Sequence, residues 1–231
     1  ELVSMAIGLR DEIPDWQDTL QERATLLGRV LEGKFGYSGD RDTYDNLQNA
    51  DIIRVIDRQK GLPVALGILY IHVARGLGWE ARGLSFPGHF LFRLEKDGQR
   101  ALLDPFQPGV ILEAADLRTL LKTIVGKQAE LAHQYYEPAT DRDILVRLQN
   151  NLKRRLIEGE DYATAVSVLE VMRSFAPRER RAYFDEGVLR AKLGQTEQAV
   201  ALLSAYIDKT PDIREKQKAQ RLLDQIKRDG E

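Results

Sequence analysis

The second half of the chain repeats itself with a period of 34 residues. The segment DYATAVSVLEVMRSFAP, which begins at Asp161, is matched by QTEQAVALLSAYIDKTP, which begins at Gln195. Four pairs of identical residues stand 34 positions apart: Ala165 and Ala199, Val166 and Val200, Leu169 and Leu203, and Pro177 and Pro211. A repeat of this length predicts stacked helix–turn–helix units, in which neighbours bury one another's apolar faces.

The period and the placement of small residues are typical of tetratricopeptide repeats. Gly187, Gly194 and Ala199 stand where small side chains let paired helices approach closely, and the two prolines stand where a helix must end. The polar segment REKQKAQRLLDQIKR follows as a capping helix. Two repeats cannot bury a core alone, so we expect the array to stack on the rest of the chain. A generic bundle of helical hairpins is the alternative interpretation.

The first half of the chain predicts helices before strands. Apolar spacing indicates a helix that opens with Pro14 and stops near Gly33. The segment LQNADIIRVIDRQKG indicates a second helix, whose apolar side carries Ile52, Ile53, Val55 and Ile56. The segment GLPVALGILYIHVARGLG is apolar at nearly every position, so the helix that begins at Pro63 should be buried on most sides.

Three strands follow in the segments WEARGLSF, HFLFRLE and QRALLDPF, with Asp97-Gly98 as a hairpin turn. An extended piece and a helix from about Glu113 come next, and no strand signal remains after Pro138. We therefore predict an α+β fold. Residues 1–138 form a domain with a small antiparallel sheet and N-terminal helices, and residues 139–231 form helical repeats with a capping helix.

Composition and charge narrow the classes of function. The formal net charge is −2, from 34 Lys and Arg against 36 Asp and Glu, so the chain has no overall field that attracts nucleic acid or an anionic membrane. It contains no cysteine, which excludes disulfides, thiolate metal sites and a cysteine nucleophile within this sequence. No apolar run is long enough to span a membrane, and we expect a cytoplasmic protein.

The hairpin FPGHFLFRLEKDGQRALLDPF brings a histidine and an aspartate together. With Asp97-Gly98 as a two-residue turn, residues whose numbers sum to 195 stand opposite each other. His89 and Asp104 are then diagonal neighbours on one face of the sheet, about 7–8 Å apart along the backbone. The opposite face carries an apolar stripe of Phe90, Phe92, Leu94, Ala101 and Leu103. Such a pair can activate a nucleophile, or it can be a hydrogen bond that joins two strands.

The segment from GLPVALGILYIHVARGLG through PGHFL to LDPF resembles the transglutaminase-like core of the papain-type superfamily. In that core a cysteine begins a buried helix, and two later strands supply a histidine and an aspartate. The helix N-terminus lowers the pKa of the thiol, the histidine takes its proton, and the aspartate orients the ring. Because tetratricopeptide repeats follow, the chain looks like the bacterial SirB-type family, which joins these two domains.

By position, the resemblance assigns His89 and Asp104 to the histidine and aspartate of the catalytic constellation. It places the cysteine position near Pro63, or one or two residues later at Val64 or Ala65. None of these three side chains can act as a nucleophile. The resemblance therefore implies a pseudoenzyme, whose His–Asp pair is a structural remnant.

An enzyme with another nucleophile is the alternative. It would be a hydrolase or acyltransferase that uses His89 and Asp104 without a cysteine. Ser85 stands on a strand beside His89 and not at a helix N-terminus, which makes it a poor candidate. A metal site formed by His72 and the His–Asp pair is not expected, since His72 lies about 13 Å along the helix from its start. We expect no cofactor, and we interpret His133 as a surface or linker residue.

The repeats offer a binding surface of their own. The inward positions of their first helices carry polar and basic side chains, namely Arg147, Asn150, Arg154, Arg181 and Lys192. Such a row could hold an acidic peptide or a C-terminal carboxylate, although a solvated face of long side chains is the alternative. We predict a regulatory or scaffolding factor that binds protein or peptide through the repeats and the former cleft. A purely architectural module, which binds only through its repeats, is a further possibility.

Overall fold

The computed structural model describes residues 1–229 and divides the chain into two compact units, Glu1–Ile144 and a second unit from Leu145 onward. The predicted boundary near residue 138 falls six residues before this division. The helices of the first unit are α1 (Leu2–Asp11), α2 (Leu20–Gly28), α3 (Ile52–Arg58), α4 (Pro63–Gly76) and α5 (Ala114–Val125). Its strands are β1 (Ser38–Gly39), β2 (Lys60–Gly61), β3 (Glu80–Leu84), β4 (Phe92–Lys96), β5 (Gln99–Leu103) and β6 (Pro138–Ala139). A π-helical segment (Arg29–Lys34) and two short 3₁₀ segments (Leu47–Asn49 and His133–Tyr136) complete it.

The central sheet has the strand order β5-β4-β3-β6, and all its pairings are antiparallel. The hairpin register is the predicted one, because Phe92 pairs with Leu103 and Lys96 pairs with Gln99. Asp97 and Gly98 both have positive φ, as a two-residue hairpin turn with matching twist requires. The ladder begins only at Phe92, however, so the predicted strand at residues 89–91 is a loop.

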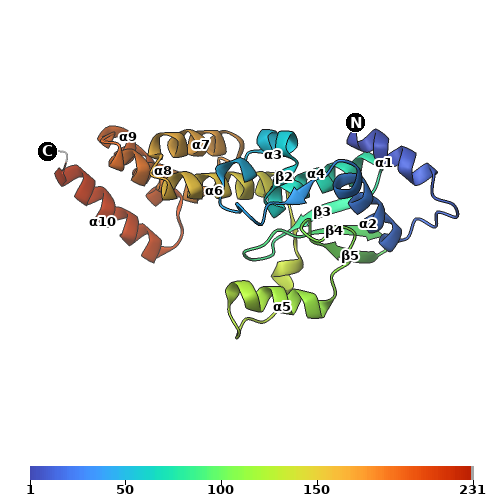
Figure 1. Ribbon diagram of the computed structural model, residues 1–231. Coiled ribbons are helices and arrows are strands. Elements are labelled where there is room, and N and C mark those ends of the chain that lie inside the picture. The colour runs from blue at the N-terminus through green and yellow to red at the C-terminus, as the bar shows by residue number, and fades with distance from the viewer. Residues whose placement is uncertain (230–231) are drawn as a thin grey trace. The chain divides into compact units, whose positions relative to one another are not determined.

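Helices cover the two faces of this sheet (Figure 1). Figure 1 shows α4 on one face and α5 on the other. On the α4 side, the Tyr70 ring packs against Phe92 with 5.4 Å between ring centroids. On the α5 side, Leu84 and Leu91 join Leu117 and Leu121 of the helix in one apolar cluster. The predicted burial of α4 is confirmed, since its residues from Pro63 to Leu69 are buried apart from a half-buried Ile68.

Two helical predictions in the first unit are wrong in detail. The helix predicted from Pro14 begins at Leu20, because Asp15 and Asp18 have positive φ and Thr19 caps the helix. Thr19 and Glu22 form a reciprocal capping box, which fixes the start of α2. In α3 only Val55 is buried, whereas Ile53 and Ile56 are 67% and 47% exposed. A seven-residue helix shows one narrow side to the core, so apolar residues adjacent in sequence point to solvent.

The second unit consists of helices. They are α6 (Asp141–Glu158, which begins in the first unit), α7 (Tyr162–Phe175), α8 (Arg180–Lys192), α9 (Thr196–Lys209) and α10 (Ile213–Asp229). The residues matched by the 34-residue period occupy equivalent places, since Ala165, Leu169, Ala199 and Leu203 are all fully buried. A Cβ on Gly187 would lie 2.9 Å from Leu203 Cγ, which explains why α8 needs a small residue against α9. The predicted α+β fold with helical repeats is confirmed.

Candidate functional site

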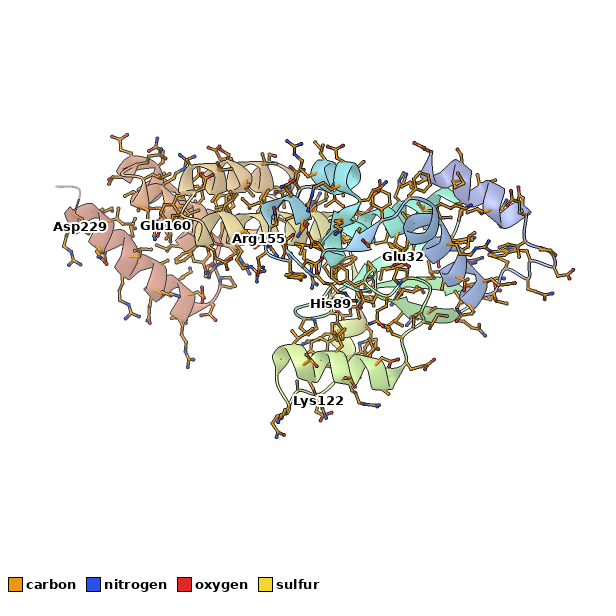
Figure 2. The ribbon with its side chains drawn as sticks, in the orientation of Figure 1. Glu32, His89, Lys122, Arg155, Glu160 and Asp229 are labelled. Carbon is orange, nitrogen blue, oxygen red and sulfur yellow. The ribbon has the colours of Figure 1, made fainter. Side chains whose placement is uncertain are left out.

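His89 and Asp104 are hydrogen-bonded, with 2.9 Å between His89 Nε2 and Asp104 Oδ1. Asp104 is buried and His89 is nearly so. His89 is labelled in Figure 2. Asp104 Oδ1 also accepts the backbone N–H of Phe106 at 2.8 Å. Because a carboxylate can only accept, Nε2 carries the proton of this bond, and Nδ1 is the nitrogen that Asp104 does not engage. The pair therefore has the geometry of an oriented general base.

Phe90 fixes the backbone beside His89. A Cβ on Gly67 of α4 would lie 2.2 Å from Phe90 Cε1, and a Cβ on Gly83 of β3 would lie 2.9 Å from Phe90 Cζ. The ring thus fits into a slot between two glycines, one on the helix and one on the sheet, and is 2% exposed. This slot anchors the loop that carries His89 to α4 and β3 through the neighbouring residue, Phe90.

The ring of Phe106 also packs against the His–Asp pair. Its ring stands edge-on to the His89 ring, with 6.1 Å between centroids, and edge-on to the Tyr44 ring at 6.3 Å. Arg41 lies over the same ring, and its Nη2 donates to the Phe106 carbonyl at 3.2 Å. The segment around Arg41 and Tyr44 thus lies against Phe106 next to the His–Asp pair.

A buried carboxylate anchors this segment. Asp40 is 2% exposed and accepts from the Thr43 hydroxyl at 2.6 Å and from the Thr43 N–H at 2.8 Å. Arg58 Nη2 donates to it at 3.3 Å, and Arg58 Nη1 donates to the fully buried Asn49 at 3.0 Å. The bonds from Thr43, more than that from Arg58, hold the pKa of Asp40 far below its ordinary value.

Protonation of Asp40 at low pH should therefore reduce the free energy of unfolding of the first unit. The folded-state pKa is lowered, so the stabilisation is complete above the unfolded pKa of about 4 and is lost as the pH falls toward the folded value. Asp40→Asn should reduce the free energy of unfolding by about 1–3 kcal/mol at neutral pH and flatten its decline between about pH 5 and 2. Urea unfolding across this range, followed by tryptophan emission, measures both. An unchanged acid slope in the variant would contradict this role of Asp40.

The start of α4 holds no nucleophile. Pro63 occupies the first helical position, after Leu62 as N-cap, and Pro63, Val64 and Ala65 are all buried. Ser85 is exposed, and its N–H donates to the Glu137 carbonyl at 3.1 Å. His72 is exposed on α4, and within residues 1–229 no group of His, Cys, Asp or Glu is arranged to hold a metal ion. His133 is 96% exposed in its short 3₁₀ segment.

A helix with a buried first turn is followed by a hairpin, and the bonded His–Asp pair lies just beyond the paired ends of its two strands. The sequence motifs predict this order of helix, histidine and aspartate. The family model of the transglutaminase-like superfamily matches residues 1–150, and that of the tetratricopeptide repeat matches residues 152–227. The chain belongs to the transglutaminase-like superfamily.

Named relatives place this transglutaminase-like protein among bacterial proteins of the SirB type, as predicted. A UPF0162 protein of Xylella fastidiosa strain Temecula1 is 34% identical over 192 residues, which cover 82% of this chain and 68% of the relative. Protein SirB1 of Salmonella typhimurium is 26% identical over 212 residues, covering 91% of this chain and 77% of SirB1. YchA of Escherichia coli K12 is 26% identical over 194 residues, covering 84% and 72%. Within the described residues, no helix is long and apolar enough to cross a membrane.

Of the residues predicted to form a binding row on the repeats, some are joined by hydrogen bonds and others lie apart. Lys153 Nζ donates to Asn150 Oδ1 at 2.8 Å and to Asp185 Oδ2 at 2.6 Å, and Arg181 Nε donates to Asp185 Oδ1 at 2.9 Å. Asn150 and Arg181 thus belong to one polar network that crosses from α6 to α8. Lys192 instead lies against Tyr162 of α7, with its Nζ 4.6 Å from the ring centroid. Arg154 faces Glu158 of its own helix at 3.9 Å, and Arg147 lies on α6.

Sequence reasoning missed Lys153 and Asp185, which join this network. Lys153 is one position before the predicted Arg154, and only the rotation of α6 determines which of the two faces α8. Asp185 is four residues after Arg181, which is the spacing of ion pairs on one helix face. That spacing was the available signal. Because Asp185 engages both cations, the network presents less free positive charge than the row of basic residues implies.

Proposed function

We propose that this protein is a non-catalytic transglutaminase-like protein that acts as a protein-binding regulatory or scaffolding factor. The observation that carries this proposal is the first turn of α4, near which the related core begins its helix with a cysteine and where this chain has Pro63, Val64 and Ala65. None of these three side chains is nucleophilic, and the 231 residues contain no cysteine that could replace one. In this proposal His89 and Asp104 order the loop between β3 and β4 and perform no proton transfer.

The repeats support the binding role. Tetratricopeptide units expose faces of successive helices, and arrays of this kind commonly bind proteins through such surfaces. Here the surface includes a polar network from Asn150 on α6 through Asp185 on α8. Arg181 extends it toward Glu215 on α10 at 3.9 Å. The partner we propose is a protein or peptide, engaged by the repeats and by the surface beside His89.

His89→Ala separates a structural pair from a catalytic one. We expect the free energy of unfolding to fall by about 1–3 kcal/mol, because buried Asp104 loses a hydrogen-bond donor. No hydrolytic or acyl-transfer activity should be lost, when wild type and variant are compared on amide, ester and thioester substrates. Urea unfolding and these assays are the measurements, and His72→Ala, at an exposed position of α4, is the matched control.

An activity of the wild type that His89→Ala abolishes would overturn the proposal, provided that the variant remains folded. It would favour the alternative enzyme, which uses His89 and Asp104 with a nucleophile other than cysteine. Ser85→Ala would then test the exposed serine of the same loop. In affinity capture with each full chain as bait, we expect wild type and His89→Ala to retain the same proteins.

A further inference from the structure

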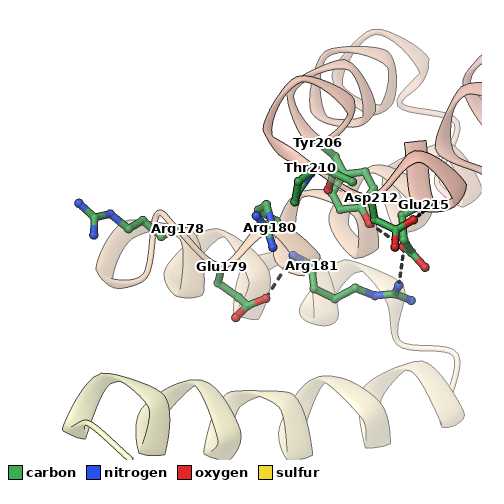
Figure 3. Close-up of a pocket in the computed structure, with 9 residues that line it drawn as sticks. Arg178, Glu179, Arg180, Arg181, Tyr206, Thr210, Asp212 and Glu215 are labelled. Atoms are coloured by element: carbon green, nitrogen blue, oxygen red, sulfur yellow. Dashed lines mark hydrogen bonds and ion pairs between the residues drawn. The ribbon is translucent and has the colours of Figure 1, made fainter. Parts of the chain in front are cut away.

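Three helix ends in the second unit surround a hollow of about 340 Å³. The N-terminal end of α8 supplies Arg178, Glu179, Arg180 and Arg181; the end of α9 supplies Tyr206 and Thr210; and the start of α10 supplies Pro211, Asp212 and Glu215. Figure 3 shows these side chains. The hollow lies at the turns that connect the helices, and it shares Arg181 with the network of Asn150 and Asp185.

The carboxylates that line this hollow are already engaged. Glu179 accepts the backbone N–H of Arg181 at 3.2 Å. Asp212 caps α10 by accepting the N–H of Arg214 at 2.8 Å and that of Glu215 at 3.0 Å. Glu215 itself accepts the Tyr206 hydroxyl at 2.7 Å. Each acidic side chain therefore has a local structural role within the fold.

The cations are engaged unequally. Arg181 donates to Asp185 at 2.9 Å and lies 3.9 Å from Glu215, toward which it extends in Figure 3. The side chains of Arg178 and Arg180 are exposed, and they make no hydrogen bond or ion pair with any residue that the structure describes. The guanidinium group of Arg180 is thus unpaired at the hollow, and so is that of Arg178, whose side chain extends away from the other lining residues in Figure 3.

We propose that this hollow binds carboxylate side chains of an acidic segment in a partner protein. Guanidinium groups donate in a planar fork that matches a carboxylate, and such charge-assisted bonds are stronger than neutral ones. The exposed wall is more polar than apolar, which favours a charged ligand over a lipid. Its only aromatic ring, that of Tyr206, is buried, so no exposed ring is available to stack on a nucleic-acid base. The inference rests on the proposed protein-binding function and assigns it a location and a chemistry.

Fluorescein-labelled hexaglutamate is the probe, titrated with the full chain at low ionic strength, where exposed charges are least screened. Arg178→Gln combined with Arg180→Gln should weaken binding at least about tenfold, equivalent to losing about 1.4 kcal/mol. Arg118→Gln combined with Arg142→Gln is the matched control, because these arginines are exposed in the first unit and the same charge is removed. That control should change the dissociation constant less than about twofold. Far-UV circular dichroism verifies that both double variants are folded.

Amide chemical shifts locate the bound peptide, and we expect the changes at residues 178–181 and 210–215. Equal weakening in the two double variants would show that hexaglutamate follows net charge alone, and it would overturn the site. An absence of hexaglutamate binding would overturn it as well. Neither result affects the proposed function, which depends on the His89→Ala comparison and on proteins retained by the full chain.

Discussion

Glu186→Ala should destabilise the second unit by about 3–5 kcal/mol, because it leaves two half-buried cations without their shared, fully buried carboxylate. Glu186 is fully buried between α7 and α8. Its Oε2 accepts Arg173 Nε at 2.6 Å, and its Oε1 accepts Arg190 Nε at 2.8 Å. Arg190 also pairs with Glu170, so the network ties α8 to α7 at two points. Removing one member of such a network exposes the full desolvation penalty of the others.

Two spectroscopic signals separate the units in this experiment. Both tryptophans, Trp16 and Trp79, lie in the first unit, so their emission reports its urea unfolding alone. Circular dichroism at 222 nm reports helices of both units. We expect the variant to lose part of its helical signal at lower urea concentration, while the tryptophan transition stays in place.

Glu158→Ala is the control for this prediction. Glu158 faces Arg154 at 3.9 Å on the surface of α6, and both side chains are more than half exposed. An exposed pair of this kind contributes about 0–1 kcal/mol, so this variant should unfold close to wild type. If Glu186→Ala and Glu158→Ala had equal effects, the buried network would not be a principal stabiliser of the repeats.

Local patterns predicted the parts of this fold that depend on a fixed period. The hairpin register followed from the turn at Asp97-Gly98, because side chains alternate strictly along a strand. The repeat followed from residues 34 positions apart, because equivalent helices bury equivalent side chains. The contact between His89 and Asp104 was predicted from the same register. The ladder stops before His89, however, so the loop conformation, and not strand pairing, brings the two side chains together.

The features that were not predicted depend on tertiary contacts. The apolar sequence at Ile53 and Ile56 suggested a buried face, but whether an apolar side chain is covered depends on which element packs against it. Lys153 and Arg154 are adjacent in sequence, and only the packing of α6 places Lys153 against Asp185. The slot for Phe90 is formed by Gly67 and Gly83, which belong to different elements. A single sequence gives no indication that these two glycines meet the same ring.

Phe90→Ala should be the most damaging single change in the first unit, reducing the free energy of unfolding by about 3–5 kcal/mol. The ring is 2% exposed between α4 and β3, and its removal leaves a cavity bounded on two sides by the backbone at Gly67 and Gly83. Such walls relax little, so most of the cavity should remain. The variant should also lose the fixed position of His89, because Phe90 no longer anchors the loop that carries it. Urea unfolding followed by tryptophan emission gives the magnitude.

Gly67→Ala tests the same slot from the helix side. In the wild type the added methyl group would lie 2.2 Å from Phe90 Cε1, so we expect a loss of about 1–3 kcal/mol from overpacking. In the Phe90→Ala background the ring is gone, and the same substitution should become neutral or stabilise by up to about 1 kcal/mol, since alanine favours helix over glycine. In the double-mutant cycle, the destabilisation caused by Gly67→Ala should thus change sign or nearly vanish once the Phe90 ring is removed. If Gly67→Ala costs the same with and without the ring, the close approach of α4 to Phe90 does not determine how the loop of His89 is held.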